Sequence, residues 1–283
     1  MKNKIPCLFL PAALSAGILL TSLRPAVAAV IYSPGDLLLG FHAPSGTGSN
    51  TSYVFNLGPA TVWRDNPLAA VPANNLNTDL TAAYGANWFA RTDLYWGIAA
   101  VRDSSGAGPN TIVNGDPRAA IYISKETTAP GASAPWNLPG SGTTSATTIS
   151  SANDISTMQG GFAGKTETLN SSGRGILQAE DLTPNSWDEF NPVGGAAFGG
   201  ILTGGVQGAL GGGSVEYLDL YRLLGRTSPD ATPNTPAGQG LYVTTFTING
   251  NGIVSTIPEP TGSLLMTLGI LSFLRRRRPV ASV

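Results

Sequence analysis

The acidic side chains are the first residues in this sequence whose type and spacing could perform chemistry. Six of them fall in close pairs: Glu180-Asp181, Asp188-Glu189, and Glu216 with Asp219. Two carboxyl groups held on either side of a glycosidic bond can hydrolyse that bond. The spacing favours no single pair, and each pair is more simply explained as a solvated turn or strand face. A glycoside hydrolase is therefore one alternative function.

His42 is the only histidine, so a Ser-His-Asp or Cys-His arrangement would have to use it. It follows the apolar run that ends at Phe41, which indicates a surface or strand-end histidine. Histidine-based zinc or iron sites need more nitrogen or sulfur ligands than this chain offers. Acidic groups with Asn185 or Asn191 could hold calcium, although no EF-hand spacing is present. We predict no catalytic residue, no metal ligand and no cofactor.

The tryptophans give a second alternative, a carbohydrate-binding module. Exposed aromatic rings on one sheet face can stack on sugar rings, whereas most tryptophans serve as core or loop anchors. The five are Trp63, Trp88, Trp96, Trp136 and Trp187. An exposed cluster would favour sugar binding, and finding all five buried would count against it.

The strongest signal lies near the C-terminus and concerns recognition by another molecule. Pro258, Glu259 and Pro260 are expected to be exposed and extended, because proline continues neither a helix nor a sheet ladder. The next 14 residues, 261–274, carry no charge and suit hydrocarbon better than water. The run ends at Arg275, Arg276, Arg277 and Arg278. This cluster crosses a bilayer only at high cost and holds its end of the chain on the cytoplasmic side.

This order of residues resembles the PEP-CTERM sorting signal of exported bacterial proteins. The resemblance covers the last 27 residues, Ile257 to Val283, and reaches the preceding domain only weakly, through its opening segment GDLLLGF. In that family an exosortase, a membrane cysteine peptidase, cuts at or near the tripeptide and releases or passes on the exported domain. The resemblance implies that Pro258–Pro260 is a recognition site for another enzyme.

The apolar run is short for a permanent membrane anchor. Its 14 residues form a helix of about 21 Å, against a hydrocarbon core of ~30 Å. A run of this length is more often a core helix, but a core helix is seldom followed by four arginines. Arginine side chains can snorkel, and a segment that is soon removed needs no lasting fit. We therefore predict a single transmembrane helix over 261–274 that anchors the chain to the inner membrane transiently.

The N-terminus has the pattern of a secretory signal peptide. Two lysines precede a mostly apolar stretch, and small residues, Ala26 and Ala28, occupy the positions that signal peptidase requires. We expect cleavage after Ala28. The only cysteine, Cys7, lies in the removed segment, so the mature chain is expected to contain neither a thiol nor a disulfide.

These boundaries divide the chain into a signal peptide (1–28), an exported domain (29–257) and a sorting signal (258–283). Seven of the 16 basic residues and one of the 17 acidic residues lie in the terminal segments. The exported domain therefore has 9 basic and 16 acidic residues, a net charge of −7. Its acidic surface without a basic cluster argues against binding nucleic acid or anionic lipid.

Residue patterns within the exported domain predict mostly short strands. Strands are expected at 37–41, 52–57, 93–102, 119–124, 214–224, 240–248 and 253–257, with a tight turn at 249–252. Ala60–Arg64 is expected to continue the sheet. Helices are expected at 77–84, at 148–160 and from Ser186, with the longest covering a sheet. The glycine-rich stretch 194–213 has no phosphate-binding pattern and predicts strands with tight turns or a loop.

Together these patterns predict a mainly β fold, an antiparallel β-sandwich or jelly roll with one or two short helices. We expect an exported protein of the cell surface or the extracellular polysaccharide matrix, without catalytic activity. Its expected partners are the export machinery, signal peptidase, an exosortase and extracellular polysaccharide. The carbohydrate-binding module and the glycoside hydrolase remain as alternatives.

Overall fold

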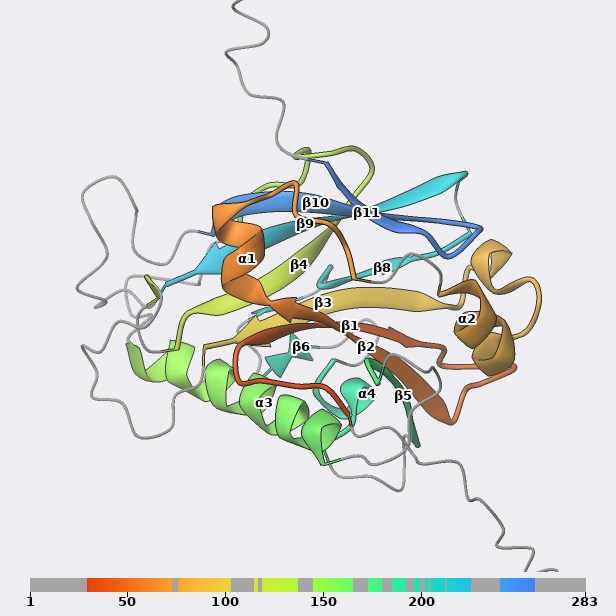
Figure 1. The fold of residues 1–283 in the computed structure, drawn as a ribbon, viewed down its shortest axis with the longest axis horizontal. Coiled ribbons are helices and arrows are strands. Elements are labelled where there is room, and N and C mark those ends of the chain that lie inside the picture. Colours follow the sequence, from red (N-terminus) through yellow and green to blue (C-terminus); the bar gives the residue numbers. More distant parts are fainter. Residues whose placement is uncertain are drawn as a thin grey trace, which may run out of the picture.

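The structure is a computed structural model (Figure 1). It describes residues 30–72, 76–102, 115–116, 119–136, 145–164, 173–179, 185–191, 196–198, 202–203, 205–211, 213–224 and 240–257. The strands are β1 (Asp36–His42), β2 (Thr51–Pro59), β3 (Tyr95–Val101), β4 (Ile121–Thr127), β5 (Gly175–Ala179), β6 (Ala196–Ala197), β7 (Leu202–Thr203), β8 (Gln207–Ala209), β9 (Val215–Leu223), β10 (Leu241–Asn249) and β11 (Val254–Ile257). The helices are α1 (Ala60–Asp65), α2 (Asn77–Tyr84), α3 (Ser145–Ala163) and α4 (Trp187–Phe190), with a 3₁₀ turn at Trp88–Ala90.

Nine of these strands form one antiparallel sheet. Its order is β11-β10-β9-β4-β3-β1-β2-β5, and β8 pairs with β3 beside this path. β6 and β7 form a separate two-stranded sheet. The sheet is curled (Figure 1). The mainly β, antiparallel fold predicted from the sequence is confirmed, but the described strands make one curled sheet and not the two facing sheets of a sandwich.

Alternating side chains of the strands bury two cores, one on each face of the sheet. Leu37, Leu39 and Phe41 of β1 enter a core that also contains Phe246 of β10, so the sheet curls around this core. Leu38 enters the opposite core. This alternation follows from the two-residue period of a strand, and it explains why β1 is apolar almost throughout.

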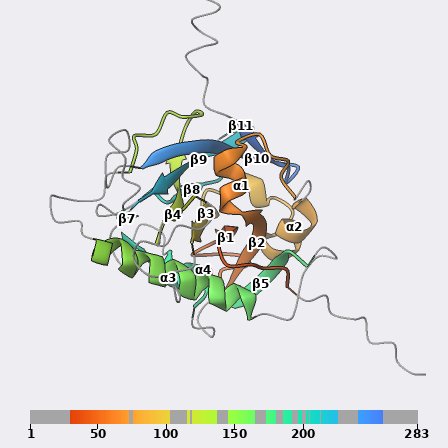
Figure 2. The same cartoon turned by 60° about the vertical axis from the view of Figure 1, so that its left-hand side comes forward.

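Helices cover both faces (Figures 1 and 2). α1 and α2 cover the core around which the sheet curls, which lies on its inner face. In this core the ring centroids of Trp63 and Phe246 lie 5.1 Å apart. α3 and α4 lie on the outer face, and α3 buries Ala152, Ile155 and other apolar residues there. The helix predicted over 148–160 is thus confirmed, although it runs from Ser145 to Ala163.

One element differs in type from the sequence prediction. Ala60–Arg64 was expected to continue the sheet, and the structure instead has α1 at Ala60–Asp65. Pro59 ends β2, because it has no N–H to donate to the ladder and its φ of −58° suits the start of a helix. Ala60 and Trp63, one helical turn apart, are the residues that α1 buries.

α4 reaches the sheet through a pair of glycines. Gly40 of β1 and Gly97 of β3 lie directly opposite each other, and the indole of Trp187 packs over them. A Cβ atom at Gly40 would lie 2.1 Å from the Trp187 ring. Glycine at position 40 is therefore required for the indole to approach the backbone.

No helix within the described residues is long and apolar enough to cross a membrane. The predicted transmembrane helix at 261–274 lies outside those residues.

Candidate functional site

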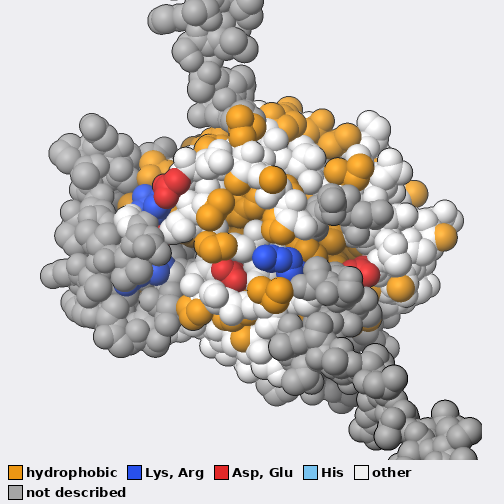
Figure 3. All heavy atoms as spheres, viewed as in Figure 1, with side chains coloured by type: hydrophobic (Ala, Val, Ile, Leu, Met, Phe, Trp, Pro, Cys, Tyr) orange, Lys and Arg blue, Asp and Glu red, His pale blue; other side chains and the backbone are white. Residues whose placement is uncertain are grey.

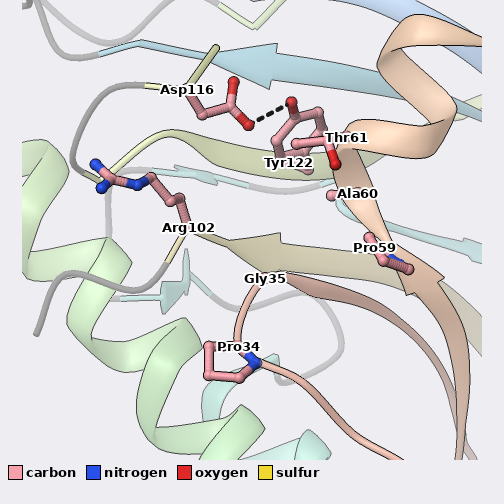
Figure 4. A pocket seen from close by; sticks show the side chains of 8 residues that line it. All are labelled: Pro34, Gly35, Pro59, Ala60, Thr61, Arg102, Asp116 and Tyr122. Carbon is pink, nitrogen blue, oxygen red and sulfur yellow. Dashed lines mark hydrogen bonds between the residues drawn. The ribbon is translucent and has the colours of Figure 1, made fainter. Parts of the chain in front are cut away.

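A pocket of about 90 Å³ lies where α1 meets the ends of β2 and β3. Its described lining consists of Pro34, Gly35, Pro59, Ala60, Thr61, Arg102, Asp116 and Tyr122. Figure 4 shows Asp116 and Tyr122 pointing toward each other at one side of this pocket, while Arg102 extends its guanidinium away from Thr61. These residues come from distant parts of the sequence, so no local spacing could have predicted the pocket.

Asp116 is the charged centre of this region, and its side chain is almost completely buried. Oδ1 accepts hydrogen bonds from Arg64 Nη1 at 2.8 Å and from Arg222 Nε at 2.7 Å. Oδ2 accepts one from the Tyr122 hydroxyl at 2.8 Å. Burial, together with the neighbouring Asp116 carboxylate, raises the pKa of Tyr122 well above its ordinary value. The phenol therefore stays a neutral donor.

This arrangement suits structural attachment better than catalysis. The carboxylate joins α1, β4 and β9 through three donors, and its two guanidinium partners offset its charge. Asp116 is the one carboxylate among the described residues that line the pocket. A glycosidase needs two carboxyl groups across its substrate. Among the described residues, no group of three His, Cys, Asp or Glu side chains could hold a metal ion.

The acidic residues considered from the sequence lie apart from this pocket. Asp219, expected on a solvated strand face, is fully buried. It accepts hydrogen bonds from Gly131 N, Ser133 N, Ser133 Oγ and Thr245 Oγ1 at 2.6–3.0 Å. The burial arises because the 129–134 loop folds across β9 and offers its amides to this carboxylate. Asp219 thus fixes a loop.

The remaining acidic candidates accept local hydrogen bonds. Glu216 accepts one from Gly213 N at 2.9 Å, and Glu189 accepts one from Asn185 N at 2.5 Å. Asp188 accepts one from Ser186 Oγ at 2.5 Å. Residues 180–181 lie outside the described part of the chain. The structure therefore brings no two of the described candidates together in the pocket.

His42 is the last residue of β1, as the strand-end prediction had it, but it is buried, at 4% exposure, and does not lie at the surface. At His42, β1 is still flanked by both of its neighbours, with Ser52 of β2 and Tyr95 of β3 opposite. The His42 and Tyr95 rings have centroids 6.3 Å apart. His42 is buried because β1 lies between β2 and β3 in the sheet.

All five tryptophans are buried, with exposures between 0% and 7%. Four of them are fully enclosed, and Trp136 lies under the Lys125 ammonium, 4.6 Å from the ring centroid. This is the outcome that counts against a sugar-stacking face built from these residues.

The predicted processing residues lie outside the described residues. They are Ala26, Ala28, Pro258, Glu259, Pro260, Arg275, Arg276, Arg277 and Arg278. The structure does describe Ile257, which directly precedes Pro258, and the chain from residue 30, two positions after Ala28. Their positions show where in the fold the two terminal segments are attached.

At the C-terminal side, Ile257 is the last residue of β11, the strand at one end of the sheet order. It lies opposite Thr245 of β10 and is 36% exposed. The Thr244 hydroxyl lies 3.2 Å from the Ile257 carbonyl and 3.3 Å from the Pro67 carbonyl. The chain therefore leaves the sheet at the surface, beside the segment that follows α1.

At the N-terminal side, the first described residues are attached to the opposite end of the sheet. Ile31 N donates to Gly173 O at 2.8 Å, and Asn56 Nδ2 donates to Ile31 O at 2.7 Å. The Tyr32 ring contacts Phe162 of α3, with centroids 6.0 Å apart. A cleavage after Ala28 would leave these contacts intact.

Comparisons of the chain with protein-family models, with curated proteins and with solved structures found no match.

Proposed function

We propose that this chain is an exported bacterial protein of the cell surface or extracellular matrix, sorted and cut by an exosortase at its C-terminal signal, with no catalytic activity of its own. The observation that carries the proposal is the order of three features in the sequence. Pro258-Glu259-Pro260 precedes an uncharged run of 14 residues, and four arginines follow it. The run suits a bilayer, and the arginines stop its transfer.

The attachment points of both terminal segments support this proposal. Ile257 ends an edge strand at the surface, so Pro258 follows the sheet directly. A peptidase in the membrane needs a cleavage segment that is not part of a folded ladder, and proline at positions 258 and 260 keeps the segment out of one. On the other side, the contacts of Ile31 and Tyr32 begin only three residues after Ala28.

The two alternative functions receive less support. The carbohydrate-binding alternative relied on exposed tryptophans, and all five are buried. The hydrolase alternative required two carboxylates in one cleft, and the pocket has Asp116 alone among its described lining residues. Asp116 is also occupied by three donors, which leaves it poorly suited to act as a base or nucleophile.

Replacing Pro258, Glu259 and Pro260 with alanine tests the proposal in a host that has the sorting enzyme. We expect the triple variant to be exported but to keep its C-terminal segment, because the recognition site is gone. The intact mass of the exported protein measures this. A matched control replaces Pro233 and Pro236, two prolines of the exported domain, and should be trimmed like the wild type. Normal trimming of the triple variant would contradict the proposal.

A further inference from the structure

Three exposed apolar side chains belong to the elements near the point where the chain leaves the sheet: Ile257 ends β11, Leu68 follows Pro67, and Val62 lies on α1, which packs on β10. Leu68 is 65% exposed, Val62 is 44% exposed and Ile257 is 36% exposed. The shared contacts of Thr244 with the Pro67 and Ile257 carbonyls place the segment after α1 next to the end of β11. Figure 3 shows apolar side chains at the surface over α1 and β10. We call Val62, Leu68 and Ile257 the exit rim.

The length of the link after Ile257 limits how far the exit rim can stand from a membrane. From Ile257 to Thr261, the start of the apolar run, the chain spans at most about 14 Å. In the inserted state that the proposed function requires, a helical run of 14 residues would be about 21 Å long. With its arginines at the cytoplasmic surface it would end about 9 Å below the outer boundary of a ~30 Å hydrocarbon core. The headgroup layer adds about 5–8 Å on each side. Crossing about 9 Å of hydrocarbon and at least about 5 Å of headgroup layer therefore takes the whole length of the link, about 14 Å.

If the bilayer thinned around the short helix, the distance between the exit rim and the membrane would change little. The link would then cross only the headgroup layer, and the exit rim would still lie within about 10 Å of it. The net charge of −7 gives the domain no electrostatic attraction to anionic lipid, so the link, and not charge, sets the distance.

We propose that the exit rim is the membrane-facing surface of the folded domain while the C-terminal segment is inserted, and that its occupant is the outer lipid headgroup layer. This inference rests on the proposed function, since it requires insertion of 261–274. Isoleucine, leucine and valine side chains at a polar–apolar boundary lose contact with water when they enter the headgroup region. The rim thereby orients the domain, with α3 and the segment around Ile31 on the far side from the bilayer (Figures 1 and 2).

The mature chain is expected to contain no cysteine, so single-cysteine labelling gives a clean test. The full mature chain, 29–283, is inserted into vesicles of phosphatidylethanolamine and phosphatidylcholine, with the label NBD on Leu68→Cys, Ile31→Cys or Ser272→Cys. Ile31 is the matched control, an isoleucine that is 47% exposed and lies at the other end of the sheet. Ser272 reports whether the apolar run has entered the bilayer.

We expect the Leu68 label to shift its emission to the blue and to be quenched by headgroup spin-labelled lipid, while the Ile31 label stays in water. A Ser272 label in hydrocarbon with the Leu68 label in water would overturn the inference and leave the proposed function standing. A Ser272 label in water would overturn both. Shielding of Leu68 that disappears when the protein is diluted at constant lipid would also overturn the inference, because the rim would then be covered by a second copy of the chain.

Discussion

Individual charged side chains in this fold join segments that are distant in sequence. Asp116 connects Arg64 of α1 with Arg222 of β9, and Asp219 connects the 129–134 loop with β10. Arg91 connects the 45–49 loop to the 3₁₀ turn through the carbonyls of Ser45 and Thr47. Each carboxylate or guanidinium has several partners, so its removal leaves polar groups unpaired.

Replacing Asp116 with alanine should destabilise the protein by about 3–5 kcal/mol, because two guanidinium groups and a phenol lose their buried acceptor. Urea denaturation of the variant measures the loss. The control is Asp65→Ala, which removes a carboxylate that is 65% exposed on the same arginine and should cost at most about 1 kcal/mol. Equal losses for the two variants would contradict the central role of Asp116.

The Arg91–Asp93 pair predicts a dependence of stability on pH. The hydrogen bonds from Arg91 lower the pKa of Asp93 to about 2. A carboxyl group whose pKa is lowered by folding stabilises the protein above its unfolded pKa, about 3.9, and loses this contribution as the pH falls toward 2. The wild type should therefore be more stable than Asp93→Asn at pH 5, and the difference should shrink by pH 2. Thermal melts across this range test it, and a constant difference would contradict the assignment.

At the scale of elements, α4 is held to the sheet by the contact of Trp187 with two glycines. Gly40→Ala should destabilise the protein by about 1–3 kcal/mol, because its Cβ would overlap the indole. The same substitution should cost much less in a Trp187→Ala background, which urea denaturation of the four proteins measures as a double-mutant cycle.

A glycine in α3 provides the control for this cycle. A Cβ atom at Gly160 would meet no atom of another element within 4 Å, so Gly160→Ala should stabilise the helix by up to about 1 kcal/mol. In the double-mutant cycle, additive losses of unfolding free energy for Gly40→Ala and Trp187→Ala would contradict the packing of the Trp187 indole over Gly40.

The elements with a strong residue pattern could be predicted from the sequence. The strands near 37–41, 52–57 and 240–248 are confirmed, because short runs rich in apolar, β-branched or aromatic residues are typical of buried strands. The helix at 77–84 is confirmed, and it ends at Gly85 as its sequence indicated. The helix α1 could not be predicted, because its six residues are too short to show a period and the decisive contact is the packing of Trp63 on Phe246. β5 and β8 are short and gain their stability from neighbouring strands.

The pocket and the burial of His42 could not be predicted from the sequence either. Arg64, Asp116 and Arg222 meet only after α1, β4 and β9 have come together. His42 is buried because the order of strands places β1 between β2 and β3, and a strand pattern does not reveal that order. The sorting signal at 258–278 stays a prediction, which is argued from the local order and charge of those residues alone.

At the scale of the whole molecule, the fold offers a surface attachment point for each terminal segment, at opposite ends of the curled sheet. Ile31 is bound beside β5, and Ile257 ends β11. Removal of residues 1–28 and of the segment after Ile257 would leave every strand of the sheet in place. The described sheet is therefore compatible with the removal of both terminal segments that the proposed function requires.

The intact mass of the protein recovered from the producing bacterium tests this account most directly. We predict a chain that begins at Ala29, ends at or near Pro258–Pro260 and is recovered outside the inner membrane. Recovery of the complete 283-residue chain from the cytosol, with both terminal segments still attached, would contradict it.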